Sequence, residues 1–168
     1  MTNTKRPYTG FDKVGTETHP AAKRLADLLA KRFGMNYMGG LSVRVMRSAP
    51  AEIQKLPPTD PKCKPFMSVH ASGRAVDVGL NDKKKLQEIA DFLVENATEF
   101  FLEEVHNYSF GEWGRGYRCS RADKNHGWVT WDAKNNGDTP GGLWIHFEVQ
   151  PNADADQLEA AFRATKKA

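Results

Sequence analysis

The sequence has few cysteines, little net charge and no long hydrophobic run. Cys63 and Cys119 are its two cysteines, which are too few for a disulfide scaffold and lack C-x-x-C spacing. Either one disulfide bridge or two buried thiols would fit. The 24 basic and 21 acidic residues give a formal net charge of +3. This charge suits an anionic polymer or an ordinary solvated surface, but it lacks the dense basic stripe of a nucleic-acid-binding protein.

No stretch of the chain is typical of a membrane span or a secretion signal. Residues 1–7 contain no apolar core, and no apolar run approaches the roughly 20 residues that a membrane-spanning helix needs. We therefore expect a protein that is made in the cytosol, is not exported by a standard signal peptide and does not enter a membrane.

Length and composition predict one globular domain over residues 1–168. The chain is long enough to bury a sizeable core, and its 39% hydrophobic and 27% charged content is that of an ordinary folded protein. Residues 1–17 are polar and interrupted by proline and glycine, which predicts an N-terminal arm lying over the domain.

Hydrophobic periodicity predicts an α+β fold with a small, mainly antiparallel sheet flanked by helices. The predicted helices begin at polar caps, namely Thr18, Asn81 or Asp82, and Asn152 or Asp154. The predicted strands are residues 41–47, 75–80, 100–105 and 143–149.

The most informative stretch is residues 68–77, which read Ser-Val-His-Ala-Ser-Gly-Arg-Ala-Val-Asp. Asp77 lies on a predicted strand and His70 on the approach to it. Gly73 between them would let the chain turn so that both side chains point to one spot. An imidazole and a carboxylate directed at one point can bind a divalent metal such as Zn²⁺, or they can form a buried hydrogen-bonded pair.

A third ligand is available on the late predicted strand, Leu-Trp-Ile-His-Phe-Glu-Val at residues 143–149. Strand alternation places Trp144, His146 and Glu148 on one face. Together with the earlier histidine and aspartate, His146 would give three protein ligands and leave a fourth position for water. That arrangement is typical of a catalytic zinc site.

The two motifs together resemble a family of zinc peptidases. The patterns S-x-H-x-x-G-x-A-x-D and, later, W-x-H-F-E are similar to those of D-alanyl-D-alanine carboxypeptidases and phage L-alanyl-D-glutamate endolysins, whose fold is shared by Hedgehog signalling domains. The first motif matches at every fixed position. The resemblance implies a Hedgehog-like fold, a Zn²⁺ ion bound by His70, Asp77 and His146, and action on peptides of bacterial peptidoglycan.

The resemblance also implies roles for residues beside the metal ligands. Arg47, at the end of a predicted strand, would stabilise the oxyanion of a tetrahedral intermediate, and Arg44 is the alternative. Ser68 and Trp144, which lie within the two motifs, are expected to contact the substrate. Glu148 is our candidate for the general base, although relatives more often use this position to support the neighbouring ligand.

The general base of the family is missing from its usual place. Relatives carry an acidic residue three positions before the last histidine ligand, or a second histidine two positions before it. Here these positions are Leu143 and Trp144, and neither side chain can accept a proton. General-base catalysis contributes about 10²–10⁴-fold, so the sequence indicates a metal site more firmly than it indicates catalysis.

Residues 107–142 mix glycines, aromatic residues and arginines, and they predict a long irregular loop. Its aromatic and basic residues would line a groove for a glycan-linked peptide or form a small core that holds the loop. Further candidates for the base lie in this segment, namely Glu112, Asp132 and Asp138. Just before it, Glu103, Glu104 and His106 are expected at the rim of the site rather than among the metal ligands.

These features lead to two functional hypotheses. The first is a zinc-dependent peptidase acting on peptidoglycan, delivered by phage lysis as an endolysin or carried in the virion beside other virion proteins. The second is a non-catalytic phage structural or wall-binding module that retains the zinc site and has Leu143 in place of the base.

Overall fold

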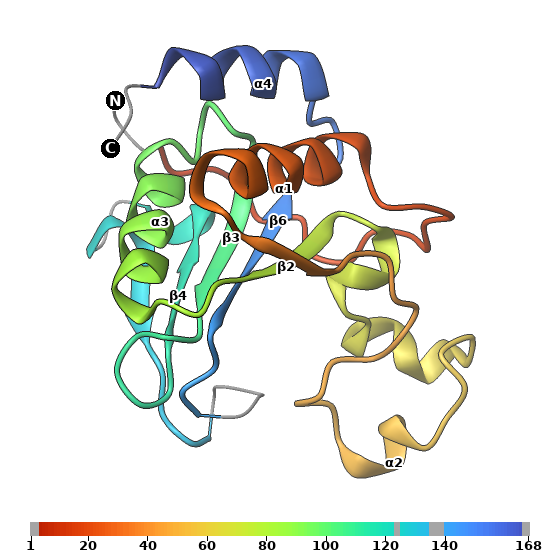
Figure 1. The fold of residues 1–168 in the computed structure, drawn as a ribbon. Helices are drawn as coiled ribbons and strands as arrows, with labels where there is room; N and C mark the ends of the chain where they lie inside the picture. Colours follow the sequence, from red (N-terminus) through yellow and green to blue (C-terminus); the bar gives the residue numbers. More distant parts are fainter. Residues whose placement is uncertain (1–3, 123–124, 135–139, 166–168) are drawn as a thin grey trace.

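One open antiparallel sheet organises the structure, a computed structural model that describes residues 4–122, 125–134 and 140–165 (Figure 1). Within those residues the strands lie in the order β1-β2-β6-β3-β4-β5, and every neighbouring pair is antiparallel. The strands are Asn36–Gly39 (β1), Ala75–Gly79 (β2), Leu102–Asn107 (β3), Arg115–Arg118 (β4), Trp128–Thr130 (β5) and Trp144–Val149 (β6). The predicted α+β class and antiparallel sheet are confirmed.

Helices α1 and α3 pack against the sheet, and α4 packs on α1 (Figure 1). The α-helices are Pro20–Phe33 (α1), Ala51–Gln54 (α2), Lys83–Glu95 (α3) and Ala155–Ala164 (α4). Short 3₁₀ helices span Pro61–Phe66 (η1), Val69–Ser72 (η2), Cys119–Arg121 (η3) and Asn125–Gly127 (η4). In the part of the chain that the structure describes, every helix is too short or too polar to cross a bilayer.

The two faces of the sheet have different roles because side chains alternate along each strand. Val76 and Val78 of β2 and Ile145 and Phe147 of β6 are fully buried in the main core beneath the helices. Burying such a side chain contributes roughly 1.5–3 kcal/mol. The residues between them point to the opposite face, which is therefore free to carry polar groups.

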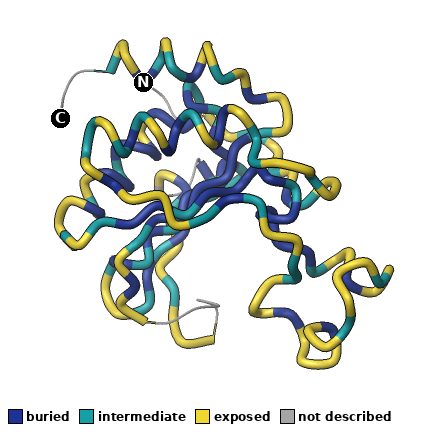
Figure 2. The backbone as a smooth tube through the Cα atoms, turned by 45° about the vertical axis from the view of Figure 1, so that its right-hand side comes forward, coloured by how far each residue is buried: buried dark blue, intermediate teal, exposed yellow. Residues whose placement is uncertain are grey.

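A lobe formed by residues 41–67 lies beside this second face (Figure 1, orange to yellow). It contains α2 and η1 and has a small hydrophobic cluster of its own, which includes Ile53, Cys63 and Met67. Most of its chain is exposed, as Figure 2 shows. The lobe has little core of its own, so its position depends on where its two ends join the sheet.

The strand expected at residues 41–47 is wrong. The edge of β2 is paired instead with β1, which ends at Gly39, and the chain then leaves the sheet to enter the lobe. Only Val45 forms an isolated bridge, to Met67, and Val43 is 43% exposed. The alternating pattern of Val43 and Val45 therefore does not correspond to a buried face of the sheet. The other three predicted strands share the sheet as β2, β3 and β6.

The long loop expected at residues 107–142 is also wrong in part, because it contains β4 and β5. These strands are four and three residues long, too short to show a clear alternation, and β4 contains a glycine. Gly116 shows why a glycine is needed there: a Cβ atom at this position would lie 2.3 Å from the ring of Trp131. The glycine makes room for the indole ring beside β4.

Helix caps follow the expected chemistry with one exception. Asp82 caps α3 and Asp154 caps α4, each through a side-chain oxygen that accepts a backbone N–H. The cap of α1 is His19 rather than Thr18. Thr18 is occupied elsewhere, because its Oγ1 accepts a hydrogen bond from the backbone N–H of Leu41 (3.1 Å).

The two cysteines do not form a disulfide. Both thiols are free and buried, Cys63 in the small cluster of the lobe and Cys119 in the main core. Burial raises the pKa of the Cys119 thiol, which keeps it protonated and unreactive.

A buried ion pair fastens the N-terminal arm to the sheet. Arg74, 2% exposed, donates to the carboxylate of Glu103 (3.2 Å), to the carbonyl oxygen of Val149 (2.6 Å) and to that of Gly10 in the arm. Glu103 is 1% exposed and also accepts a hydrogen bond from the Thr9 hydroxyl (2.6 Å). Removing one partner would leave the other charge buried and unpaired.

The substitution Arg74→Ala is therefore expected to lower the free energy of unfolding by about 3–5 kcal/mol, because it leaves the buried Glu103 carboxylate without its ion-pair partner. Urea denaturation followed by circular dichroism measures the change. The matched control is Lys23→Ala, which breaks an exposed pair with Asp27 and should cost at most about 0.5 kcal/mol. Equal effects of the two substitutions would contradict a stabilising role for the buried ion pair between Arg74 and Glu103.

Candidate metal centre

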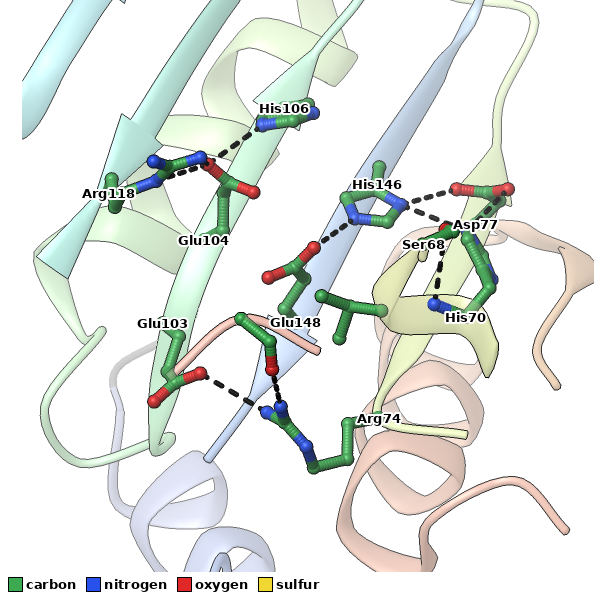
Figure 3. Close-up of polar contacts among 12 residues, drawn as sticks. Ser68, His70, Arg74, Asp77, Glu103, Glu104, His106, Arg118, His146 and Glu148 are labelled. Atoms are coloured by element: carbon green, nitrogen blue, oxygen red, sulfur yellow. Dashed lines mark hydrogen bonds and ion pairs between the residues drawn. The ribbon is translucent and has the colours of Figure 1, made fainter. Parts of the chain in front are cut away.

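Three side chains converge on the polar face of the sheet where β2 and β6 lie side by side. Asp77 and His146 are directly opposite each other in the register of these strands. His70 reaches the same point from η2, the 3₁₀ turn that precedes β2. His70, Asp77 and His146 form a group that could hold a metal ion (Figure 3).

The spacing of the ligand atoms fits a tetrahedral ion. His70 Nε2 lies 3.2 Å from His146 Nδ1 and 3.3 Å from Asp77 Oδ2, and His146 Nδ1 lies 2.9 Å from Asp77 Oδ1. Ligands bound tetrahedrally to zinc at 2.0–2.2 Å would be separated by roughly 3.3–3.6 Å. The two ring nitrogens and the Asp77 carboxylate are therefore close to the positions that such an ion requires.

The opposite nitrogen of each ring is already engaged. His70 Nδ1 lies 2.7 Å from the carbonyl oxygen of Gly40, so Nδ1 carries the proton and Nε2 presents its lone pair. His146 Nε2 lies 3.1 Å from Glu148 Oε1 and donates its proton there. His146 Nδ1 faces Asp77 Oδ1 (2.9 Å) and can hold either a second proton or a metal ion. The two ring nitrogens and the carboxylate therefore favour a cation between them. Partners of this kind are what metal-binding histidines use to fix their tautomer.

The local electrostatics favour positive charge in the same place. Burial acts to lower the pKa of His146, but its hydrogen bonds to Asp77 and Glu148 and the charges of these carboxylates outweigh burial and raise this pKa to about 10. Burial likewise acts to raise the pKa of Asp77, but the hydrogen bonds and charges of the two histidines hold it well below its usual range. A metal ion would compete with a proton for this position.

The first motif builds the turn that presents His70. The Ser68 hydroxyl accepts a hydrogen bond from the backbone N–H of His70 (3.3 Å), which caps η2. Gly73 ends the turn with φ 77°, and a Cβ atom there would lie 2.1 Å from the carbonyl oxygen of Glu17. The serine and the glycine of the motif are therefore needed for the shape of the turn.

A cavity of about 590 Å³ opens beside the three ligands. Its lobe side carries the cations Arg44, Arg47 and Lys64, and its sheet side carries the aromatic residues Tyr108, Trp131 and Trp144. The rings of Tyr108 and Trp144 stack with centroids 4.7 Å apart. The cavity can therefore hold a ligand that has both negative charge and a flat or apolar part.

The structure brings most of the predicted site residues to this cavity. Arg47 and its alternative Arg44 lie on the lobe side, and Ser68, Trp144 and Glu148 are also in its wall. Glu148 lies behind the His146 ring. Its Oε1 accepts from His146 Nε2 and its Oε2 accepts from the Tyr8 hydroxyl (3.0 Å).

Two of the predicted base candidates lie elsewhere. Among the described residues that line the cavity, neither Glu112 nor Asp132 is present, and both side chains are exposed. Asp138 lies outside the described residues. Leu143, at the position where the resemblance implied a general base, is 40% exposed and does not line the cavity either.

The prediction of a rim position for Glu103 and Glu104 is wrong, because both are buried. Glu104 and His106 lie in the cavity wall on β3, immediately beside β6. Tyr8 of the N-terminal arm and Arg118 of β4 also line it and were not anticipated. The E-x-H spacing on β3, matching H-x-E on β6, was the one sequence signal that could have found the β3 pair.

Comparisons with protein-family models, with curated proteins and with solved structures found no match to this chain.

Purified protein is expected to bind one divalent transition-metal ion, and His70→Ala is expected to lose it because one of three ligand atoms disappears. Elemental analysis after dialysis against trace zinc measures the metal content. His126→Asn is a matched control, since His126 is exposed and Asn tolerates its positive φ of 51°. Equal metal content in native protein and His70→Ala would rule out this centre.

Glu148→Gln is expected to weaken metal binding by about 10–100-fold, because the amide loses the charge that fixes the His146 ring. Competition with a fluorescent chelator measures the dissociation constant. Glu112→Gln removes an equivalent charge outside the cavity and should leave that constant unchanged. Unchanged metal affinity in Glu148→Gln together with lost turnover would instead identify Glu148 as the general base.

Proposed function

We propose that this protein is a zinc-dependent peptidase that acts on the peptides of bacterial peptidoglycan, with the fold of the D-alanyl-D-alanine peptidases and Hedgehog domains. The observation that carries the proposal is the convergence of His70 Nε2, His146 Nδ1 and the Asp77 carboxylate beside an open cavity. Three protein ligands leave one position of a tetrahedral ion for water or substrate, as catalytic rather than structural zinc sites do.

Zinc is the metal that this donor set favours. Two of the three ligand atoms are imidazole nitrogens, whereas calcium and magnesium sites are built from oxygen ligands. A zinc ion at this point would polarise a peptide carbonyl and lower the pKa of water.

The cavity walls support a peptide substrate with charged and apolar parts. Arg47 is our candidate for stabilising the oxyanion that forms during hydrolysis, because a cation on the cavity wall stabilises charge that develops in the transition state. Ser68 supports the His70 turn and borders the space where substrate would lie. The stacked pair of Tyr108 and Trp144 offers a flat surface to an apolar side chain or a sugar ring.

Glu148 is better suited to positioning than to proton transfer. Its two carboxylate oxygens are engaged by His146 Nε2 and by the Tyr8 hydroxyl. Both contacts lie on the side of the ring away from the lone pair that would bind metal. We therefore assign Glu148 the role of orienting His146.

Peptidoglycan as the substrate rests on the resemblance of the two motifs to phage endolysins and wall carboxypeptidases. In that setting the enzyme is made in the host cytoplasm and reaches the wall at lysis, or it is carried in the virion with other virion proteins. The modest positive charge is compatible with an anionic wall.

A second candidate function is a non-catalytic zinc-containing module of a phage particle or a wall-binding protein. The observation that favours it is Leu143, which cannot accept a proton and lies outside the cavity wall. Loss of a general base typically costs about 10²–10⁴-fold in rate, so such a module would bind wall fragments without cutting them.

Zinc-loaded native protein is expected to release new amino or carboxyl termini from purified peptidoglycan, and Asp77→Asn is expected to abolish this release. Mass spectrometry of the soluble fragments measures it and identifies the bond. Asp132→Asn, an exposed carboxylate outside the cavity, serves as the control. Binding to peptidoglycan without any released fragment, in protein shown to contain zinc, would favour the non-catalytic module.

A further inference from the structure

Two glutamate–histidine pairs lie side by side on neighbouring strands. The register of β3 and β6 places Glu104 opposite Glu148 and His106 opposite His146. The two imidazole rings have centroids 5.1 Å apart and are tilted by 32°. The pair on β6 belongs to the metal centre, whereas the pair on β3 has no role in holding the ion (Figure 3).

The β3 pair has a fixed tautomer. His106 Nε2 lies 3.2 Å from Glu104 Oε1, so Nε2 carries the proton and Nδ1 has the lone pair. Within the described residues, Nδ1 makes no hydrogen bond. His106 is about one-fifth exposed and lies in the cavity wall. Its free nitrogen can therefore meet water or substrate inside the cavity.

Glu104 is held rigidly as a charged group. It is 3% exposed, and its Oε1 accepts hydrogen bonds from Arg118 Nε (2.7 Å) and Nη2 (2.6 Å). Its Oε2 lies 3.3 Å from the Tyr8 hydroxyl. Burial acts to raise the pKa of Glu104, but the charges and hydrogen bonds of His106 and Arg118 hold it well below its usual range. An ionised, immobile carboxylate orients the imidazole and stabilises its protonated form.

The space around His106 is shaped for its ring. Trp131 meets it edge-on, with ring centroids 4.5 Å apart and planes at 88°. Gly116 is its partner in the register with β4, and a Cβ atom there would lie 3.2 Å from His106 Cδ2 as well as against Trp131. Trp131 and the backbone of β4 therefore hold the ring in place in the cavity wall.

We propose that His106, oriented by Glu104, is the proton-transfer residue of the hydrolysis, in place of the acid that relatives carry at the position of Leu143. This inference rests on the proposed peptidase function. The row Asp77, His146, His106 runs across three adjacent strands, which lie about 4.8 Å apart. His106 therefore lies on the side of His146 away from Asp77 and lines the same cavity as the three ligands, where its free nitrogen can exchange a proton with water.

The proton balance of the step is simple. His106 Nδ1 accepts a proton from the attacking water as the water oxygen bonds to the peptide carbonyl carbon, and the carbonyl π electrons move to oxygen. The oxyanion then re-forms the C=O bond as the C–N bond breaks, the C–N electron pair stays on nitrogen, and His106 returns the proton to that nitrogen. Water and peptide are consumed, an amine and a carboxylic acid are formed, and the histidine is regenerated.

The first test compares native protein, His106→Gln and His106→Ala, all loaded with zinc, against the matched control His126→Asn. The expected result is a fall in kcat on the order of 10²–10⁴-fold in both His106 variants, with KM and zinc content unchanged. Added imidazole should restore part of the activity of His106→Ala and should not accelerate the native protein.

The second test does not depend on turnover. Acetohydroxamate binds a metal as its anion, so a neighbouring base that accepts its proton strengthens binding. Isothermal titration should show a dissociation constant roughly tenfold higher or more for His106→Gln than for native protein. His126→Asn should bind as native protein does.

The outcomes separate the two proposals. Native turnover that survives in His106→Gln, or a kcat loss explained by lost zinc, overturns the role of His106 and leaves the peptidase standing. Absence of turnover in zinc-loaded native protein overturns the peptidase and the hydrolytic role of His106 with it. The hydroxamate measurement then shows whether His106 accepts a proton at the metal centre at all, and equal affinities would exclude that as well.

Discussion

The structure is organised around the meeting of two imidazole lone pairs and a carboxylate at one point. His70, Asp77 and His146 would repel one another through their electron pairs unless a proton or a metal ion lay between them. Gly40 and Glu148 fix the opposite nitrogens of the two rings, so the rings cannot turn to relieve this repulsion. The affinity for a positive ion is therefore a property of the fold, not of three mobile side chains.

The two faces of the sheet have different roles, one in stabilising the fold and the other in carrying the polar groups of the site. Its helix-covered face contains aliphatic and aromatic side chains and supplies most of the hydrophobic stabilisation. Its other face carries an ordered row of ionisable groups that would be costly to bury without partners. Arg74 and Glu103 form an ion pair at one end of this face, and Arg74 also hydrogen-bonds to the N-terminal arm that contains Tyr8. The hydroxyl of Tyr8 then lies between the carboxylates of Glu104 and Glu148.

The prediction of strands from the sequence was wrong where the alternation of apolar and polar residues in a segment did not match a buried face of the sheet. Residues 41–47 alternate in hydrophobicity but lie in the lobe, because β1 had already occupied the edge of β2. The strands β4 and β5 are too short to show alternation, and Gly116 of β4 makes room for Trp131. Which strands pair depends on both partner segments, which are far apart in the chain. The hydrophobic pattern of one segment does not say which partner it pairs with.

The sequence by itself determined the local parts of the metal centre. Ser68 and Gly73 specify the His70 turn through a cap and a positive φ, and strand alternation puts Asp77 and His146 on polar faces. These are interactions between near neighbours in the chain, so a short motif contains them. Only the tertiary structure decided that Glu104 and His106 lie beside Glu148 and His146 and that Leu143 lies away from the cavity. Those positions follow from the register between β3 and β6, which depends on contacts between residues about 40 apart in the chain.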